Sequence, residues 1–313
     1  PSRSPIRWTE SLPRWSPSFL DEGKGHKGPA WLRYGLAALF LFGAFVAVMA
    51  LSQDDLLFPT SAVPPPGPLP AGAERFSIHI PAKERLHGVH IPPSAPVEGA
   101  RTLVLGFGGN AWNGADVASY LHQLYPFAHT VAFHYRGYSP STGRPSAQAL
   151  LADAPLVLDS AIERVEPERV LVVGFSIGSG IAASLAQRPV DGAILVTPFD
   201  SLTAVARDLY PWLPVGLLFR HEMNAAEYLQ GSEVPVAMLA AERDDIIPPE
   251  RTEALRGKAG KLVYDRTIAG AGHNDLYGRA EFEKAMQEAF AALVAAGERS
   301  GRMAPKNAAH PEE

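Results

Sequence analysis

Short apolar runs that alternate with helical patterns fill the sequence between residues 75 and 296. The runs in the middle of this region are continuously apolar, as expected of strands that are covered on both faces. Strands that alternate with helices pair mostly in parallel and place their helices on both faces of one sheet. The sequence therefore predicts an α/β fold with eight strands, at 75–80, 86–91, 102–107, 130–135, 170–175, 193–197, 236–241 and 261–268.

Helical periodicity is clearest in three intervening segments, 146–165, 177–186 and 281–294. In the first, apolar residues recur every three to four positions, which predicts an amphipathic helix with one face on the sheet. In sheets of this type, ligands bind beyond the carboxyl ends of the strands. The residues that follow each predicted strand are therefore the first candidates for a functional site.

Composition excludes several classes of function. The 313 residues carry a net charge of −5 and a pI near 6.1, so there is no basic field for the phosphates of a nucleic acid. The chain has no cysteine, which excludes disulfides, thiolate metal sites and a cysteine nucleophile.

An uninterrupted run of apolar and glycine residues extends from Tyr34 to Ala50. A helix over 34–52 roughly reaches across the ~30 Å hydrocarbon core of a bilayer, and the run lacks the polar stripe of a buried core helix. The run is longer than the apolar core of a secretory signal, which favours an uncleaved anchor. Six basic residues precede it, and no Lys or Arg follows until Arg75. The positive-inside rule then predicts a single-pass membrane protein with residues 1–33 in the cytoplasm and the remaining chain on the extracytoplasmic side.

Two segments without helical or strand patterns flank the predicted domain at 75–296. Residues 53–74 are rich in proline and glycine, which predicts an extended linker between the membrane and the domain. Residues 297–313 are polar and lack periodicity, which predicts a disordered tail.

Three strand ends carry the residues of a possible nucleophilic site. Ser176, the pair Asp244 and Asp245, and His273 each follow a predicted strand. A serine hydroxyl near neutral pH needs an imidazole to take its proton, and the imidazole needs a carboxylate to orient it. The order serine, acid, histidine is typical of a nucleophile on a strand-to-helix turn. Either aspartate could supply the carboxylate, although adjacent aspartates before prolines are also common in solvated turns.

Glycines flank Ser176 at the spacing that such a turn requires. Gly174 and Gly178 lie two residues before and after it, where the close approach of helix and strand leaves no room for a side chain. A chance match is not rare in a chain with 28 glycines, so the placement between a buried strand and a small-residue helix carries the prediction. We therefore predict that Ser176 is a nucleophile and not part of a simple turn.

Backbone donors for a developing oxyanion come from the loop "GFGGNAWN" and from the start of the helix after Ser176. Fixed N–H groups at these two places stabilise the negative charge that forms when a carbonyl is attacked. The predicted pair is the N–H groups of Asn110 and Ile177.

The same loop permits an alternative from another class of enzyme. Gly106, Gly108 and Ala111 satisfy the dinucleotide-binding pattern G-x-G-x-x-A. The next strand is followed by Arg136 and lacks the acidic residue that NAD requires, so this alternative is an NADP-binding oxidoreductase. It leaves Ser176 and His273 without a function.

Three histidines fall close together on two early strands. The spacing of His79, His87 and His90 is better explained by the exposed face of a hairpin than by a metal site. The sequence therefore predicts no metal centre.

These motifs resemble those of the α/β-hydrolase superfamily, and within it the membrane-associated, serine aminopeptidase-like hydrolases with a small lid. The resemblance runs from about residue 56 to residue 293 and includes "GFSIGSG", "HYRGYSPSTGRPS", "YPWLPVGLLFR", "AERDDIIPPE" and "AGAGHNDL". It implies an α/β-hydrolase fold with a short apolar lid over 202–229, where ordinary packing on the sheet is the alternative. In this branch the acid is followed by two residues, an aliphatic residue and a proline, which selects Asp244.

Two positions depart from the pattern of the family. Gly108 stands where a histidine is usual before Gly-Asn, and His134 stands where an acidic residue is common before Tyr-Arg-Gly. The first change leaves the backbone donors of the loop intact, so hydrolysis remains the expectation.

The resemblance implies a serine hydrolase that cleaves an ester, thioester or amide bond through Ser176, His273 and Asp244, with an acyl-enzyme intermediate. Carboxylesterase or lipase-like activity and aminopeptidase-like activity both fit, and acyl transfer to another acceptor uses the same residues. The implied substrate is a small-molecule or lipid-like ester or amide. The predicted chemistry needs neither a metal nor an organic cofactor.

Overall fold

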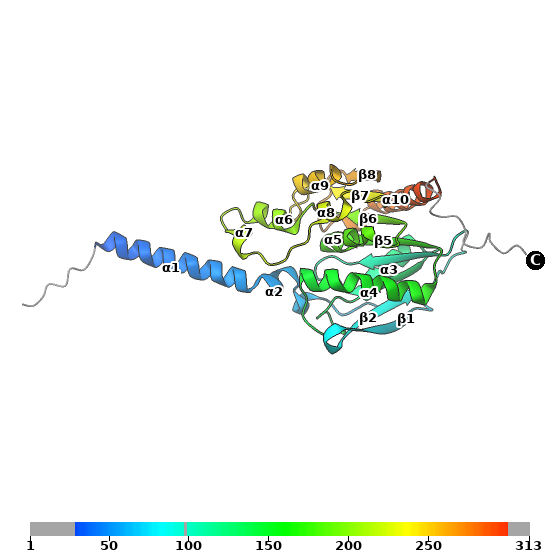
Figure 1. Cartoon of the computed structure of the whole chain (residues 1–313), viewed down its shortest axis with the longest axis horizontal. Helices are drawn as coiled ribbons and strands as arrows, with labels where there is room; N and C mark the ends of the chain where they lie inside the picture. Colours follow the sequence, from blue (N-terminus) through cyan, green and yellow to red (C-terminus); the bar gives the residue numbers. More distant parts are fainter. Residues whose placement is uncertain (1–28, 97–98, 300–313) are drawn as a thin grey trace, which may run out of the picture. The chain divides into compact units, whose positions relative to one another are not determined.

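The computed structural model describes residues 29–96 and 99–299, and the chain divides into two units at Ala47 (Figure 1). Helix α1 (Ala30–Leu51) contains 22 residues with a mean hydropathy of 2.3 and no buried residue. It is the one helix among the described residues that is long and apolar enough to cross a membrane. It begins four residues before the predicted span, and residues 1–28 of the predicted cytoplasmic segment lie outside the described part of the chain.

The second unit contains one sheet of eight strands in the order β1-β2-β4-β3-β5-β6-β7-β8. Strands β1 and β2 and the pair β2 and β4 are antiparallel, and all other neighbours are parallel. The predicted mostly parallel sheet is confirmed, with strand boundaries within two residues of those expected. The strands are β1 (Glu74–Ile80), β2 (Glu84–Ile91), β3 (Thr102–Phe107), β4 (His129–Phe133), β5 (Arg169–Phe175), β6 (Gly192–Val196), β7 (Val236–Ala241) and β8 (Leu262–Ile268).

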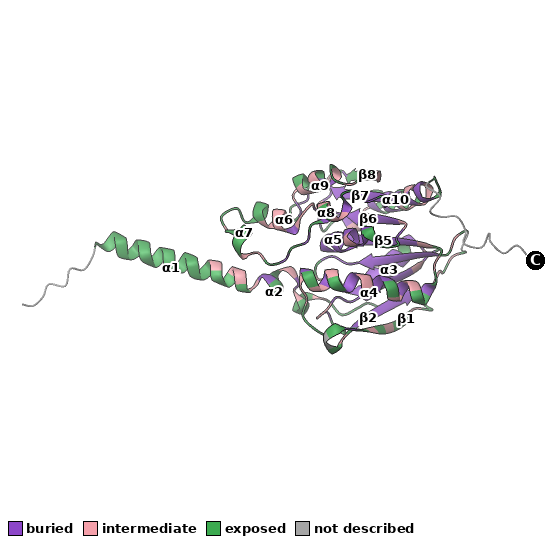
Figure 2. Ribbon diagram, viewed as in Figure 1, coloured by how far each residue is buried: buried purple, intermediate pink, exposed green. Residues whose placement is uncertain are grey.

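Helices cover both faces of the sheet, and Figure 2 shows the central strands between them as buried. Helices α3 (Gly114–Leu124) and α10 (Ala280–Arg299) form one apolar core with the sheet. Helices α4 (Ala147–Val165) and α5 (Ile177–Ser184) form the second core on the other face. Shorter elements are η2 (Pro81–Lys83), η3 (Leu185–Gln187), α9 (Pro249–Arg256) and η4 (Leu276–Gly278).

The predicted lid region folds into α6 (Leu202–Leu209), α7 (Val215–Leu218) and α8 (Ala225–Leu229). Helix α8 packs on α5, and the buried Met223 lies against α5 at Gly180, whose missing side chain leaves room for it. The end of this segment near α8 is therefore packed on the domain, whereas Leu217 in α7 is 88% exposed.

The segment 53–74 is not the extended linker that its composition predicts. It forms α2 (Gln53–Leu57) and η1 (Thr60–Ala62), and the Phe58 side chain is 1% exposed in the domain core. The Pro64 carbonyl accepts a hydrogen bond from Asn113 Nδ2 at 3.3 Å, and the Gly67 N–H donates to Asp116 Oδ1 at 2.8 Å. The prolines still prevent a long helix or strand, but their free carbonyls and one large apolar side chain attach this strap to the domain.

The C-terminal boundary also differs from the prediction. Helix α10 continues to Arg299, so the first three residues of the predicted tail are helical. Residues 300–313, which make up the rest of that tail, lie outside the described part of the chain.

Candidate active site

Ser176 stands at the turn between β5 and α5. Its backbone adopts φ 51° and ψ −118°, a conformation that residues with a side chain rarely take. The Ser176 N–H donates to the Val196 carbonyl at 2.9 Å, and the Ser179 hydroxyl donates to the Ser176 carbonyl at 2.6 Å. These bonds hold the strained turn with the Ser176 side chain at the carboxyl end of the sheet.

The two glycines that flank Ser176 lie where backbone segments touch. A Cβ on Gly174 would collide with the Gly178 carbonyl, and a Cβ on Gly178 would collide with the Phe107 carbonyl at the end of β3. Helix α5 therefore begins in direct contact with β5 and with the loop after β3. This contact between backbone segments requires glycine at both positions, which is the steric reason on which the sequence prediction is based.

Asp244 lies in the turn after β7, and its side chain is held by the backbone. Asp244 Oδ1 accepts hydrogen bonds from the N–H groups of Ile246 at 3.0 Å and Ile247 at 2.7 Å. The side chain is 4% exposed, whereas the neighbouring Asp245 is exposed. Of the two aspartates left open by the strand-end argument, Asp244 is the one that is directed at the histidine.

His273 connects the other two predicted residues. Its Nδ1 lies 2.8 Å from Asp244 Oδ2 and 2.9 Å from Oδ1, and its Nε2 lies 3.0 Å from Ser176 Oγ. The carboxylate bond at Nδ1 favours the tautomer with the proton on Nδ1, which leaves Nε2 free to accept the serine proton. The structure therefore brings Ser176, His273 and Asp244 into one hydrogen-bonded chain, and each of them is less than a tenth exposed.

The predicted oxyanion donors both lie beside Ser176. Ile177 is the first residue of α5, so its N–H has no acceptor within the helix and lies at the positive end of the helix dipole. Asn110 lines the same cleft as Ser176 and His273. The preceding residue, Gly109, approaches the serine so closely that a Cβ there would lie 3.6 Å from Ser176 Cβ.

A cleft of about 400 Å³ opens beside Ser176 and His273, and one of its walls is aromatic. The rings of Trp112, Tyr120 and Tyr277 form this wall, with centroids 5.4 to 6.4 Å apart. Tyrosine hydroxyls are neutral at pH 7, and burial raises the pKa of both these tyrosines further. The lining residues are Gly109, Asn110, Ala111, Trp112, Tyr120, Ser176, Ile246, His273, Asn274 and Tyr277.

Sequence reasoning missed this aromatic wall. Its three rings come from the loop after β3, from α3 and from the turn after β8, which the sheet brings together. The available signal was position, because Trp112 follows Asn110 by two residues and Tyr277 follows His273 by four. None of the described residues that line the cleft belongs to 202–229, so the predicted lid does not form a wall of it.

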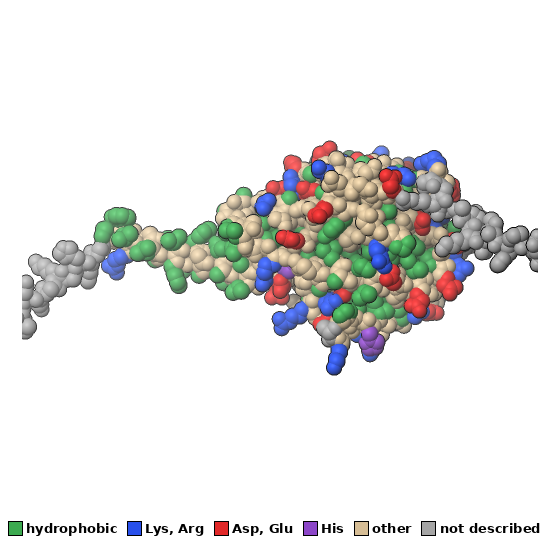
Figure 3. All heavy atoms as spheres, in the orientation of Figure 1, with side chains coloured by type: hydrophobic (Ala, Val, Ile, Leu, Met, Phe, Trp, Pro, Cys, Tyr) green, Lys and Arg blue, Asp and Glu red, His purple; other side chains and the backbone are tan. Residues whose placement is uncertain are grey.

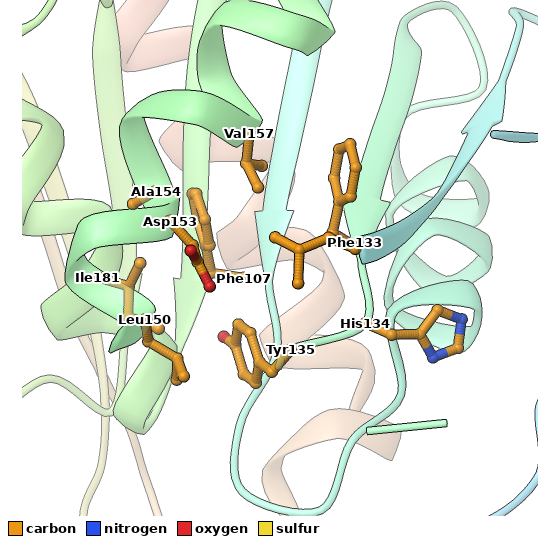
Figure 4. Close-up of a pocket in the computed structure, with 10 residues that line it drawn as sticks. Phe107, Phe133, His134, Tyr135, Leu150, Asp153, Ala154, Val157 and Ile181 are labelled. Atoms are coloured by element: carbon orange, nitrogen blue, oxygen red, sulfur yellow. The ribbon is translucent and has the colours of Figure 1, made fainter. Parts of the chain in front are cut away.

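Tyr135 holds the loop that carries Asn110. Its hydroxyl donates a 2.7 Å hydrogen bond to the Gly108 carbonyl, two residues before Asn110. Burial raises the pKa of Tyr135 well above the usual value, so the hydroxyl remains a donor. The Tyr135 ring lines a small cavity with Phe107, and Figure 4 shows the His134 ring turned away from the other labelled side chains.

His134, which replaces the acidic residue usual in the family, is 3% exposed. Burial is the main cause that lowers the pKa of His134 to about 4, and repulsion from the charged form of the nearby His87 is the second. The side chain is therefore neutral at pH 7 and places no charge next to the loop.

Arg136 is fully engaged by carboxylates. Its Nη1 lies 2.6 Å from Glu84 Oε2, its Nε donates to Asp153 Oδ2 at 2.9 Å, and its Nη2 also pairs with Asp153. The guanidinium is 14% exposed. The cation that the NADP alternative needs for a ribose phosphate is therefore already bound within the domain.

Gly106 has a packing explanation of its own. It lies inside β3, where a Cβ would collide with Leu121 and Val117 of α3. Close packing of α3 on the strand therefore accounts for the first glycine of the dinucleotide pattern.

The three early histidines do not share one exposed face. His79 is exposed, as predicted, but His90 is 8% exposed and its Nε2 lies 3.0 Å from His129 Nδ1. The prediction is wrong for His90 because it lies three residues after His87 on β2, and side chains alternate along a strand, so the two histidines lie on opposite faces of the sheet. Within residues 29–96 and 99–299, no three His, Cys, Asp or Glu side chains gather as metal ligands.

Comparison with known proteins places these features in context. No family model matches the chain. The uncharacterized protein Rv2307c of Mycobacterium tuberculosis is 32% identical over 246 residues, which are 77% of this chain and 86% of the relative. A lysophosphatidylserine lipase of Danio rerio is 28% identical over 192 residues, covering 54% of this chain and 48% of that protein. An uncharacterized membrane protein of Saccharomyces cerevisiae is 34% identical over 154 residues, covering 46% of this chain and 54% of the yeast protein.

Solved structures show the same fold. An α/β hydrolase of Vibrio vulnificus superposes with a TM-score of 0.61 at 20% identity, covering 78% of this chain and 92% of that one. The Pyrococcus furiosus esterase Pf2001 superposes with a TM-score of 0.59 at 15% identity, covering 74% and 97%. With the mostly parallel sheet, these likenesses show that the chain has the α/β-hydrolase fold, and the identity with the mycobacterial protein shows that the two chains belong to one family.

Proposed function

We propose that the chain is a serine hydrolase whose catalytic residues are Ser176, His273 and Asp244. The observation that carries the proposal is the unbroken series of hydrogen bonds from the Asp244 carboxylate through His273 to Ser176 Oγ, beside a cleft of about 400 Å³. A serine on a strained turn with an imidazole nitrogen at its hydroxyl is the arrangement that makes this weak nucleophile reactive.

The proposed reaction has two steps. Ser176 Oγ attacks the substrate carbonyl carbon while its proton moves to His273 Nε2, and the N–H groups of Asn110 and Ile177 stabilise the oxyanion. The tetrahedral intermediate collapses, and the leaving group departs with the proton from His273. A water molecule then loses a proton to His273 and attacks the acyl-enzyme, which releases the acid and restores the serine. Asp244 keeps the imidazole oriented and stabilises its charged form throughout.

The walls of the cleft favour a substrate with an apolar portion next to its carbonyl. The rings of Trp112, Tyr120 and Tyr277 offer apolar surface with neutral hydroxyls, which suits an acyl chain or an aromatic group. One relative is named a lysophosphatidylserine lipase, which supports a lipid-like ester among the possible substrates. We therefore place carboxylesterase or lipase-like activity first and keep aminopeptidase-like amide hydrolysis and acyl transfer, which use the same residues, as alternatives.

The NADP-dependent oxidoreductase is a weaker candidate on two grounds. Arg136 is paired with Glu84 and Asp153, and the glycine at Gly106 is explained by packing against α3. The oxidoreductase would also leave the hydrogen-bonded Ser176 and His273 without a function.

We propose further that α1 anchors the hydrolase in a membrane. Its 22 residues and mean hydropathy of 2.3 suit a membrane span, and one relative is described as a membrane protein. The basic residues before α1 favour a cytoplasmic N-terminus, so the hydrolase domain is expected on the extracytoplasmic side.

A fluorophosphonate probe tests the nucleophile. The full-length chain should react with the probe and hydrolyse p-nitrophenyl esters, and Ser176→Ala should lose labelling and about a thousandfold or more of the hydrolysis rate. Ser184→Ala is the matched control, because Ser184 is at the other end of α5 and its hydroxyl donates only to the Ile181 carbonyl of its own helix. Equal labelling of the parent and Ser176→Ala chains would refute the proposed mechanism.

A further inference from the structure

The segment 202–229, called the lid here after its predicted role, is fastened to the residues that follow α1. The side chain of Gln53 is almost fully buried, and its amide group binds the lid at two points. Gln53 Nε2 donates to the Leu218 carbonyl at 3.1 Å, and Gln53 Oε1 accepts from the Arg220 N–H at 2.8 Å. Because Gln53 comes two residues after Leu51, the end of α1 and the lid are held together by a buried polar side chain.

One ion pair, between Arg220 and Asp54, and a close contact of His221 with Asp54 strengthen this connection; burial lowers the pKa of His221, so its ring is neutral at pH 7. Asp54 Oδ1 lies 2.9 Å from His221 Nε2 and 3.5 Å from Arg220 Nη2. The Arg220 guanidinium also lies 3.5 Å from the Ala50 carbonyl in the last turn of α1. The His221 ring packs edge-on against Phe58 of the strap, with centroids 5.6 Å apart. The base of the lid is thus attached to residues 50–58 by hydrogen bonds, charge and ring packing.

The tip of the lid is apolar and exposed. We define the lid tip as Leu209, Tyr210, Trp212 and Leu217, whose exposed fractions are 40%, 38%, 47% and 88%. Figure 3 shows hydrophobic side chains at the position that α7 occupies in Figure 1. Tyr210 and Trp212 lie edge to face, with ring centroids 6.3 Å apart. Large apolar side chains gathered on a surface are typical of a contact with a membrane or a partner. Tryptophan and tyrosine are also the residues that favour the boundary between water and lipid.

We propose that the lid tip docks into the headgroup and acyl boundary of the same bilayer that α1 spans. This inference rests on the proposed anchoring by α1. Residues at the end of a spanning helix lie at the bilayer surface, and the Gln53 contacts hold Leu218 and Arg220 next to that end. The partner is lipid and not a second protein, because the tip is continuous with a segment that is itself fixed at the lipid surface. The side chain of Arg220 is 57% exposed at the same place and suits the phosphate of a lipid headgroup.

The absence of cysteine allows a direct test by single-cysteine labelling. The full-length chain with Leu217→Cys, Leu41→Cys or Glu163→Cys is labelled with a fluorophore and reconstituted in vesicles of phosphatidylcholine and phosphatidylglycerol that carry a nitroxide quencher on the acyl chain. Leu41 reports the anchor, and Leu217 reports the lid tip. Glu163 is the control, because it is exposed on α4 at a distance of roughly 24 Å along the helix from Ala147, whose N–H contacts His221 of the lid.

The expected result is quenching of the labels at 41 and 217, by about half or more at 217, with the label at 163 unchanged. Quenching at 41 without quenching at 217 would refute docking of the lid and leave the anchor standing. No quenching at 41 would refute the anchor and docking together. A label at 217 that is protected from aqueous iodide but not quenched by the lipid would indicate a protein partner and would also refute the proposal.

A second substitution tests the Gln53 contact itself. Gln53→Ala removes the two bonds to the lid, so quenching at 217 should fall while quenching at 41 stays the same. Ser52→Ala is the matched control, because the Ser52 side chain makes no capping hydrogen bond at α2. Equal quenching at 217 in the Gln53→Ala and parent chains would show that the contact does not position the lid tip.

Discussion

At the scale of single residues, the hydroxyl of Tyr135 is the least expected contributor to the candidate site. It fixes the Gly108 carbonyl and thereby the peptide units that lead to Asn110. Tyr135 does not line the cleft, so we regard it as a positioning residue for the proposed oxyanion donor.

Replacing Tyr135 with phenylalanine tests this assignment. The change leaves a buried carbonyl without its donor, which corresponds to about 1–2 kcal/mol and a fall in kcat of roughly 5- to 30-fold. Because ground-state binding is unaffected, KM for a p-nitrophenyl ester should stay within about twofold. Tyr264→Phe is the control, since it removes a bond of equal length, 2.7 Å to Glu288, far from the site. A rise in KM with unchanged kcat would contradict the assignment.

The pairing of Ser176 with His273 could be anticipated from the sequence, because each residue follows a strand whose apolar run is unmistakable. The choice between Asp244 and Asp245 could not be made from strand position, since both follow β7. The choice depends on the turn that lets two N–H groups, those of Ile246 and Ile247, bind the Asp244 carboxylate. A sequence shows the aspartates but not the direction of the turn.

At the scale of secondary-structure elements, the contact between α5 and the loop after β3 joins the proposed nucleophile to the proposed oxyanion loop. The contact is possible because Gly178 has no side chain. Any residue with a Cβ at this position must displace the Phe107 and Gly108 carbonyls.

Gly178→Ala should therefore harm both stability and activity. The forced displacement of packed backbone is expected to lower the free energy of unfolding by about 1–3 kcal/mol and to reduce labelling by fluorophosphonate. Gly257→Ala is the matched control, because Gly257 has φ −67° and a Cβ there would meet only the Ala254 carbonyl at 3.8 Å. The control should leave stability unchanged or raise it by about 0.4–1 kcal/mol. Denaturation in detergent solution measures both variants, and equal stabilities would argue against the contact.

The strands were easier to predict than the strap. Continuous apolar runs such as Val236–Ala241 can only be buried, so their boundaries agree with the structure. The strap contains Phe58 among prolines and glycines. A single apolar residue in such a segment does not predict that its side chain is buried in the domain core. The missing information is tertiary, because the groups that bind the strap belong to α3 and to the lid.

At the scale of the whole molecule, the membrane topology remains a prediction from charge. Basic residues precede α1, and the first charged residues after it are Asp54 and Asp55. The basic residues before α1 resist transfer across the membrane, which favours export of the hydrolase domain that follows α1.

Cysteine labelling in right-side-out membrane vesicles checks this topology. A membrane-impermeant maleimide should react with Glu163→Cys on the hydrolase domain before permeabilisation and with Ser16→Cys in the N-terminal segment only after it. The parent chain has no cysteine and serves as the blank. The reverse pattern of labelling would place the hydrolase domain in the cytoplasm and overturn the predicted orientation.

The strap also limits how far the domain can search for a substrate. A flexible linker of the length of 53–74 would have a reach of roughly 25 Å, so a domain attached by it could sample a wide volume of solution around the proposed anchor. The strap is instead hydrogen-bonded to Asn113 and Asp116, and its Phe58 side chain is buried in the domain core. These contacts remove almost all of that freedom of movement. A domain held this close to its proposed anchor meets few additional substrate molecules through its own motion. The rate at which it encounters substrate therefore depends on how quickly substrate molecules diffuse to it.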